Sequence, residues 1–162
     1  VGSEIISAFG IDRFKKNVDE MDPITGNRAK LGLNVSSFEY ISAKQRVSEL
    51  EVIVNQHFMK YDALLSPTTV MQALDVNKAE IGKELHERSL LASANTQPVN
   101  IFGICAITYP IQKFATIQSQ DILPIGLQII CNKNEDEKVV EIALSLEKHF
   151  GEPELPNMNK FL

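Results

Sequence analysis

The sequence has few features of the specialised classes of protein. It contains only two cysteines, Cys105 and Cys131, and none of its apolar stretches approaches the roughly 18 residues of a membrane-spanning helix. Both cysteines lie in apolar runs, which is typical of small, reduced core residues rather than of a disulfide. We therefore expect a protein of the reducing cytoplasm, with no membrane among its partners.

Basic residues are too few for a nucleic-acid partner. Sixteen Lys and Arg stand against 21 Asp and Glu, which gives a net charge of −5. Proteins that bind a nucleic-acid backbone need clustered Lys and Arg, so we expect no nucleic acid to bind. The composition, 44% hydrophobic and 23% charged, is that of a folded globular chain. Residues 1–162 are long enough for a single domain or part of a larger one, and they permit a homodimer as well as a monomer.

Local catalytic and metal-binding motifs are absent from the sequence. The histidines at positions 57, 86 and 149 have no partner at a ligand spacing, so we expect no metal and no cofactor. A Gly-x-Ser-x-Gly turn and a glycine-rich phosphate loop are both missing. The one adjacent serine pair, Ser36 and Ser37, precedes Glu39 in a pattern that favours a helix start. The residues alone predict no catalytic machinery.

Helical and strand patterns alternate along the chain, which is typical of an α/β protein. The strongest are two helices with apolar residues at helical spacing and capping boxes at Ser36/Glu39 and Asn134/Glu137. The predicted elements are, in order, an opening helix around Gly10, a loop at 22–27, a helix over about 37–58, a strand from 61 to Pro67, a helix over about 77–94, a proline-punctuated stretch at 95–103 with a turn at 98–103, a strand at 105–110, a loop at 113–121, a strand at 124–131 and a helix ending at 150.

Three motifs occur together in one order. They read YDALLSPTT at 61–69, PVNIFGICAITYP at 98–110 and LPIGLQII at 123–130, and a helix with an acidic start follows. With this order and spacing the chain resembles the carboxy-terminal part of the amidase signature family, over about residues 28–150. Where the family's middle motif has Pro-Ala after the turn glycine, this sequence has Cys105-Ala106.

The resemblance implies a fold and an activity. The fold is α/β, with helices flanking a mixed, mostly parallel central sheet, and the reaction is hydrolysis or transfer at carbon–nitrogen amide bonds of a small molecule. Family members use a Ser-cis-Ser-Lys triad that belongs to the amino-terminal half, and nothing in these residues matches it. We therefore expect no catalytic residue here and a missing amino-terminal catalytic half as the partner.

The family also suggests where the substrate pocket is lined. The turn at 98–103 and the segment before it make Ser93, Thr96, Asn100 and Phe102 candidates for substrate binding. Arg28 lies near the place where amidotransferase-type members hold a substrate carboxylate. The alternatives are that Asn100 ties down a turn, that Phe102 is a core residue and that Arg28 is simply solvated.

Two other functions are left open by the sequence. One is a stand-alone, non-catalytic binding or structural module. The other is a fragment of a glutamyl-tRNA amidotransferase subunit. Against the second, Ser93 stands where those subunits carry an aspartate for the amino group of glutamine, and a hydroxyl cannot supply that charge-assisted hydrogen bond.

Overall fold

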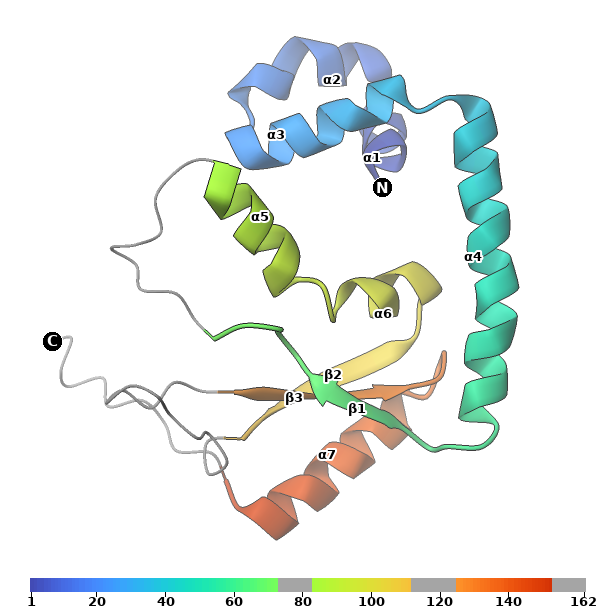
Figure 1. The fold of residues 1–162 in the computed structure, drawn as a ribbon, viewed down its shortest axis with the longest axis vertical. Coiled ribbons are helices and arrows are strands. Elements are labelled where there is room, and N and C mark those ends of the chain that lie inside the picture. The colour runs from blue at the N-terminus through green and yellow to red at the C-terminus, as the bar shows by residue number, and fades with distance from the viewer. Residues whose placement is uncertain (73–82, 112–124, 153–162) are drawn as a thin grey trace, which may run out of the picture. The chain divides into compact units, whose positions relative to one another are not determined.

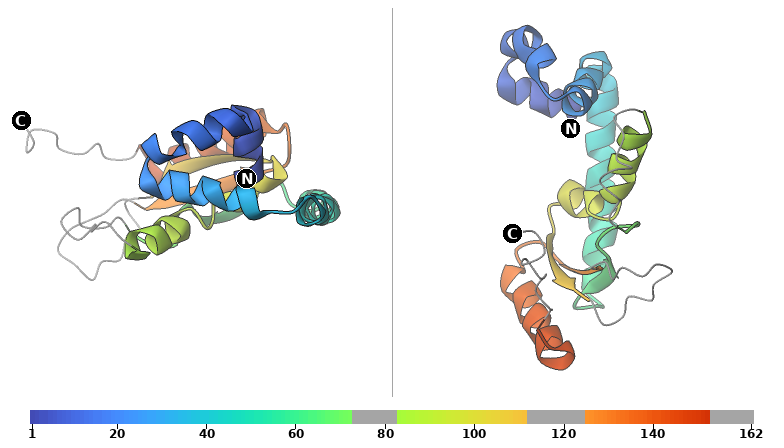
Figure 2. Two further views of the ribbon diagram at one scale, coloured as in Figure 1. Left: turned by 90° about the horizontal axis from the view of Figure 1, so that it is seen from above. Right: turned by 90° about the vertical axis from the view of Figure 1, so that its left-hand side faces the viewer.

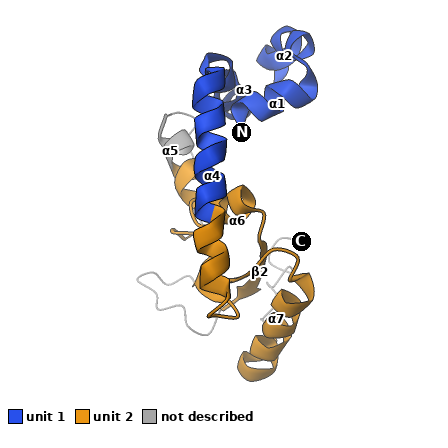
Figure 3. Ribbon diagram, turned by 90° about the vertical axis from the view of Figure 1, so that its right-hand side faces the viewer, with its two compact units in different colours: residues 1–50 blue, residues 51–162 orange. Residues whose placement is uncertain are grey.

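The computed structural model describes residues 1–72, 83–111 and 125–152 of the chain (Figure 1). They form two compact units, residues 1–50 and residues 51–162 (Figure 3). The predicted loop at 113–121 and the first part of the predicted helix at 77–94 lie outside the described residues. Within the described part of the chain, every helix is too short or too polar to cross a membrane.

The first unit begins with a cluster of short helices, drawn in blue in Figure 2. Gly10, at a φ of 82°, divides the predicted opening helix into two. The helices enclose a small core of Ile6, Phe14, Val18 and Ala29. They are α1 (Gly2–Phe9), α2 (Ile11–Asn17), a 3-10 turn (Val18–Glu20), α3 (Pro23–Lys30) and a second 3-10 turn (Leu31–Asn34).

The loop predicted at 22–27 is wrong, because these residues begin α3. Asp22 is its N-cap, with Oδ1 accepting from the N–H of Thr25 at 3.0 Å, and Pro23 occupies the first turn. The same residue types that favour turns also favour helix starts, since a proline needs no backbone N–H there.

Ionised Asp22 is expected to stabilise the first unit in a pH-dependent way. The hydrogen bond from Thr25 holds the pKa of the Asp22 carboxyl below its ordinary value of 3.8. Its contribution is therefore present above that value and is lost as the pH falls through the folded pKa, between about pH 5 and pH 2. Asp22→Asn keeps the cap but has no carboxylate to protonate. As the pH is lowered through this range, the protection of the α3 amides against hydrogen exchange should therefore fall less steeply in this variant than in the unmodified chain. Equal pH profiles would contradict the prediction.

The helix α4 (Ser37–Phe58) confirms the longest predicted helix and its capping box. The backbone N–H of Ser36 donates to Glu39 Oε2 at 2.8 Å, and that of Glu39 donates to Ser36 Oγ at 3.2 Å. None of its residues is buried, and the predicted apolar face, which includes Val47 and Phe58, is half-buried.

The second unit contains a three-stranded sheet in the order β1-β3-β2. Its strands are β1 (Leu64–Pro67), β2 (Cys105–Pro110) and β3 (Gly126–Cys131), as the strand patterns predicted. Both outer strands run antiparallel to β3, so the expectation of a mostly parallel sheet is not met in the described strands. An apolar run shows that a strand is buried but does not set its direction, which depends on the strand it pairs with.

One face of the sheet is covered by α7 (Asp136–Phe150), the last predicted helix (Figure 1). The buried residues of this layer are Tyr109, Ile129, Cys131 and Val139. The capping box at Asn134 and Glu137 is wrong, because Asn134 has a φ of 62° and the helix begins two residues later. The carboxylate of Glu135 instead accepts from the N–H of Asn132 at 3.1 Å and closes the turn before the helix.

Between β1 and β2, the described residues form two helices, α5 (Lys83–Ala92) and α6 (Gln97–Phe102). The turn predicted at 98–103 is instead most of α6, because Pro98 fits the first turn of the helix and Gly103, at a φ of 60°, ends it. Figures 1 and 2 show α6 and α7 on opposite sides of the sheet. Four of the predicted pocket residues lie in this segment, either between α5 and α6 or within α6.

Candidate functional site

Four of the five predicted site residues lie at the corner between α5 and α6. Ser93 directly follows α5, Thr96 is the N-cap of α6, and Asn100 and Phe102 lie within α6. Asn100 is exposed and the other three are half-buried. Arg28, the fifth, is an exposed residue of α3 in the first unit.

Hydrogen bonds within the corner hold the Ser93 hydroxyl. Its Oγ lies 3.2 Å from the carbonyl oxygens of both Ser89 and Leu90, to which it donates, and it accepts from Gln97 Nε2 at 3.0 Å. Thr96 Oγ1 donates to the Ser93 carbonyl at 3.1 Å. The single proton of the hydroxyl is used inside the helix, which leaves Ser93 one lone pair for a ligand. Ser93 can therefore accept a hydrogen bond from a substrate N–H but cannot donate one without breaking this arrangement.

Asn95 connects the corner to the sheet. Its Nδ2 donates to the carbonyl oxygen of Pro67, at the end of β1, at 2.7 Å. Neither Asn95 nor Gln97 is among the predicted site residues. The signal available was the short polar side chains of Ser93, Asn95 and Thr96, which are suited to bonding nearby backbone between two helices.

The structure also bears on the alternatives for Asn100 and Phe102. The Asn100 side chain makes no hydrogen bond with the residues that the structure describes, so the alternative that it stabilises a turn has no support from them. Phe102 is half-buried and belongs to neither of the two described core clusters. Both side chains stay candidates for a pocket wall.

A row of uncharged polar residues crosses the sheet on the side away from α7. Gln128 of β3 has Ser66 of β1 and Thr108 of β2 as its register partners. The hydroxyls of Thr68 and Thr108 lie 3.2 Å apart. A Cβ at Gly126 would lie 2.6 Å from Thr68 Oγ1 and 2.7 Å from the Thr108 methyl carbon, so these two side chains can meet only across a glycine.

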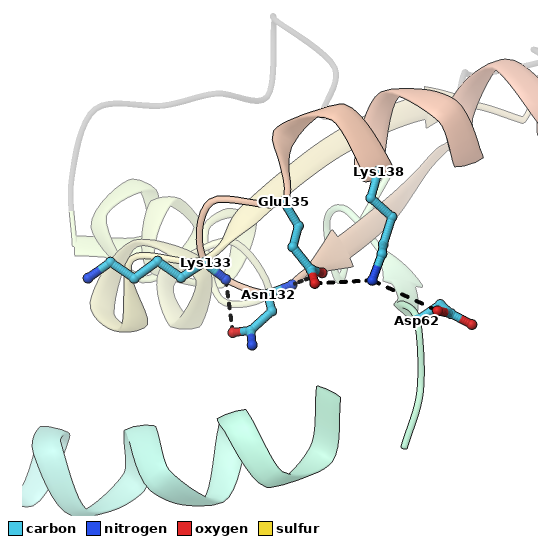
Figure 4. Close-up of polar contacts among 5 residues, drawn as sticks. All are labelled: Asp62, Asn132, Lys133, Glu135 and Lys138. Carbon is cyan, nitrogen blue, oxygen red and sulfur yellow. Dashed lines mark hydrogen bonds and ion pairs between the residues drawn. The ribbon is translucent and has the colours of Figure 1, made fainter. Parts of the chain in front are cut away.

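One group of charged residues in the second unit lies at the turn between β3 and α7 (Figure 4). Lys138 Nζ lies 3.1 Å from Glu135 and 3.8 Å from Asp62. The hydrogen bond with Glu135 raises the pKa of Lys138, so the ammonium stays charged and cannot act as a base near neutral pH. These charges stabilise the turn and do not form a catalytic centre.

The buried Cys131 is not placed as a catalytic nucleophile. Cys105 and Cys131 are register partners in adjacent strands, and both are free thiols. Burial raises the pKa of the Cys131 thiol, which suppresses the reactive thiolate. Among the described residues, no three His, Cys, Asp or Glu side chains lie together as a metal site would require.

Comparison with known proteins gives consistent matches. A family model described as Amidase matches residues 6–140. The 2-amino-5-chloromuconic acid deaminase of Comamonas testosteroni is 28% identical over 160 residues, which cover 93% of this chain and 33% of that protein. A glutamyl-tRNA(Gln) amidotransferase subunit of Halothermothrix orenii is 30% identical over 152 residues, which cover 91% of this chain and 29% of that protein.

The fold matches as well. A crystal structure of an amidase aligns with 92% of this chain and 32% of its own, with a TM-score of 0.67 and 21% identity. The chain thus spans about a third of the length of the relatives it matches.

Proposed function

This chain belongs to the amidase family, and from that premise we propose that it is the carboxy-terminal part of an enzyme that hydrolyses carbon–nitrogen amide bonds. The family match over residues 6–140 carries the proposal. The Ser-cis-Ser-Lys residues belong, in this proposal, to an amino-terminal catalytic half in the same cytoplasmic enzyme. The 162 residues of this chain supply the supporting sheet and one wall of the substrate pocket.

The corner between α5 and α6 is the proposed wall. Its half-buried polar side chains, Ser93 and Thr96, are uncharged, and Ser93 has one lone pair left for a substrate N–H. A neutral small-molecule amide has N–H donors and a carbonyl acceptor, so uncharged hydrogen-bonding groups suit it. Asn95 supports the wall by anchoring it to β1.

Activity measured on two polypeptides tests the proposal. Ammonia release from a primary amide such as propionamide should be found with the native gene product and be absent with the isolated 162-residue chain. The native product should have a mass above 18.1 kDa and should lose activity with a serine-reactive reagent. A native mass near 18.1 kDa and no hydrolysis by either polypeptide would favour the stand-alone binding module instead.

A glutamyl-tRNA amidotransferase subunit is the second candidate, because relatives with that name match most of this chain. The position of Ser93 separates the two functions. In the native enzyme, Ser93→Asp should place a carboxylate where a substrate ammonium group would lie. It should therefore lower the KM for an α-amino amide such as glutamine about tenfold relative to propionamide.

Ala94→Asp is the matched control for this substitution, since it adds the same charge at an exposed neighbour. It should change neither KM. If Ser93→Asp also leaves the ratio of the two KM values unchanged, Ser93 does not line the pocket. If the unmodified enzyme already has a much lower KM for glutamine than for propionamide, that result favours the amidotransferase function over a general amidase.

A further inference from the structure

We propose that Cys105 and Cys131 form an oxidation-sensitive pair, in which a peroxide oxidises Cys105 and the product closes a disulfide with Cys131. Both thiols are free in the structure, which therefore shows the reduced form of the pair. The proposal rests on the register of β2 and β3, on the face that both side chains share and on the difference in their exposure. It does not depend on the proposed amide hydrolysis.

The two cysteines lie directly opposite each other in neighbouring strands. Cys105 is the register partner of Cys131, and their strands run antiparallel. Opposite residues of an antiparallel pair point to the same face of the sheet. Cys131 belongs to the core cluster between the sheet and α7, and Cys105 packs against the same cluster. The two thiols are therefore neighbours on the face that α7 covers.

The hydrogen bonds between β2 and β3 set the distance that the disulfide must span. The N–H of Ile111 donates to the carbonyl oxygen of Ile125 at 2.7 Å, in the same register. Hydrogen-bonded pairs recur at every second residue of an antiparallel ladder, so Cys105 and Cys131 form one too, with Cα atoms about 5.5 Å apart. Disulfides span Cα distances of about 4.4–6.8 Å. Cys105 begins β2 and Cys131 ends β3, so the end of the ladder can adjust to bring the two sulfur atoms into bonding distance.

Exposure decides which cysteine meets the oxidant first. Cys105 is half-buried, whereas Cys131 is 0% exposed. Burial also raises the pKa of the Cys131 thiol, which keeps this sulfur protonated. Because oxidation by peroxide follows thiolate character and access to solvent, Cys105 is the residue that reacts first.

The chemistry takes two steps and uses a peroxide as the oxidant. The Cys105 thiolate attacks one oxygen of hydrogen peroxide, the O–O bond breaks, and a sulfenic acid and hydroxide are formed. The sulfenic acid then condenses with the Cys131 thiol: an S–S bond forms, the S–O bond breaks, and the thiol proton leaves with the hydroxyl group as water. Two electrons pass from the two thiols to the peroxide. The fixed position of Cys131 opposite Cys105 offsets its raised pKa, because the condensation is intramolecular.

Peptide mapping of the native gene product tests the pair. Trypsin places Cys105 in the peptide 89–113 and Cys131 in the peptide 114–133, and neither peptide contains a methionine that peroxide could oxidise. After treatment with hydrogen peroxide and blocking of the remaining thiols, most of the two peptides should be found joined, with the sum of their masses less two hydrogen atoms. Dithiothreitol should separate them. The proposal fails if both thiols survive the peroxide, or if Cys105 is oxidised to a sulfinic acid with no joined peptide.

The matched control is the double substitution Cys105→Ser and Ala106→Cys, which moves the outer thiol by one residue. Position 106 is exposed and points to the opposite face of β2. The moved cysteine should form a sulfenic acid, which dimedone traps, and should not join Cys131. If it joins Cys131 to the same extent as Cys105 does, the strand register does not govern the reaction and the proposal fails.

A second variant tests the role of Cys131 in the condensation. In Cys131→Ala the sulfenic acid of Cys105 has no thiol opposite it, so the dimedone adduct of Cys105 should be about tenfold more abundant than in the unmodified chain. An equal amount of adduct in the two proteins would overturn the proposal. If Cys131→Ala does not fold, the joined peptide of the unmodified chain and its absence from the double variant decide the question.

Discussion

Replacing Ile129 by alanine is expected to lower the free energy of unfolding of the second unit by about 2–5 kcal/mol. Ile129 lies in the central strand and is 0% exposed, in the cluster that joins the sheet to α7. The substitution removes buried methyl and methylene groups and leaves a cavity that the two surrounding layers cannot fully close. Urea unfolding followed by hydrogen exchange of the β3 and α7 amides would measure the loss within this unit.

The matched control for Ile129 is Leu144→Ala, which trims an apolar side chain that is 51% exposed on α7. It should change the free energy by no more than about 0.5 kcal/mol. Ile129→Val should fall between the two, at about 0.5–1.5 kcal/mol. A loss from Leu144→Ala equal to that from Ile129→Ala would mean that α7 is not held by the core described above.

Replacing Gly32 by alanine should destabilise the first unit by about 3 kcal/mol. A Cβ at position 32 would overlap the carbonyl carbon of Gly2 and the backbone nitrogen of Ser3, and it would lie 2.8 Å from the carbonyl oxygen of Gly2. These are backbone atoms of α1, so no side-chain rotation relieves the overlap. The helix would have to separate from the 3-10 turn at Leu31–Asn34, with loss of the hydrogen bond from Ser3 Oγ to the Gly32 carbonyl.

Hydrogen exchange of the α1 amides would report this separation directly. Ser7→Ala is the control, because it introduces an alanine at an exposed position of α1 and should leave exchange unchanged. Unchanged protection of α1 in Gly32→Ala would contradict the close backbone contact. The second unit should keep its protection in either variant, because the overlap involves only residues of the first.

Local patterns in the sequence were enough for the elements that depend on near neighbours. The apolar spacing of α4 and α7 and the capping box at Ser36 and Glu39 are contacts within one or two helical turns, so they can be read without the fold. The three motifs were enough to identify the family, because their order and spacing along the chain can be read without the fold. The loop predicted at 22–27 and the turn predicted at 98–103 mark the limit of such patterns, since proline and aspartate suit turns and helix starts alike.

Tertiary structure alone decided the features that join distant residues. The antiparallel direction of the strands follows from the pairing of β3 with β1 and β2, which no local pattern encodes. The bond from Asn95 to Pro67 and the meeting of Thr68 with Thr108 across Gly126 join residues 28 and 40 positions apart. The sequence by itself determined that Gln128 lies in a strand. Only the tertiary structure shows that its side chain is buried and that its oxygen has no donor from the described residues.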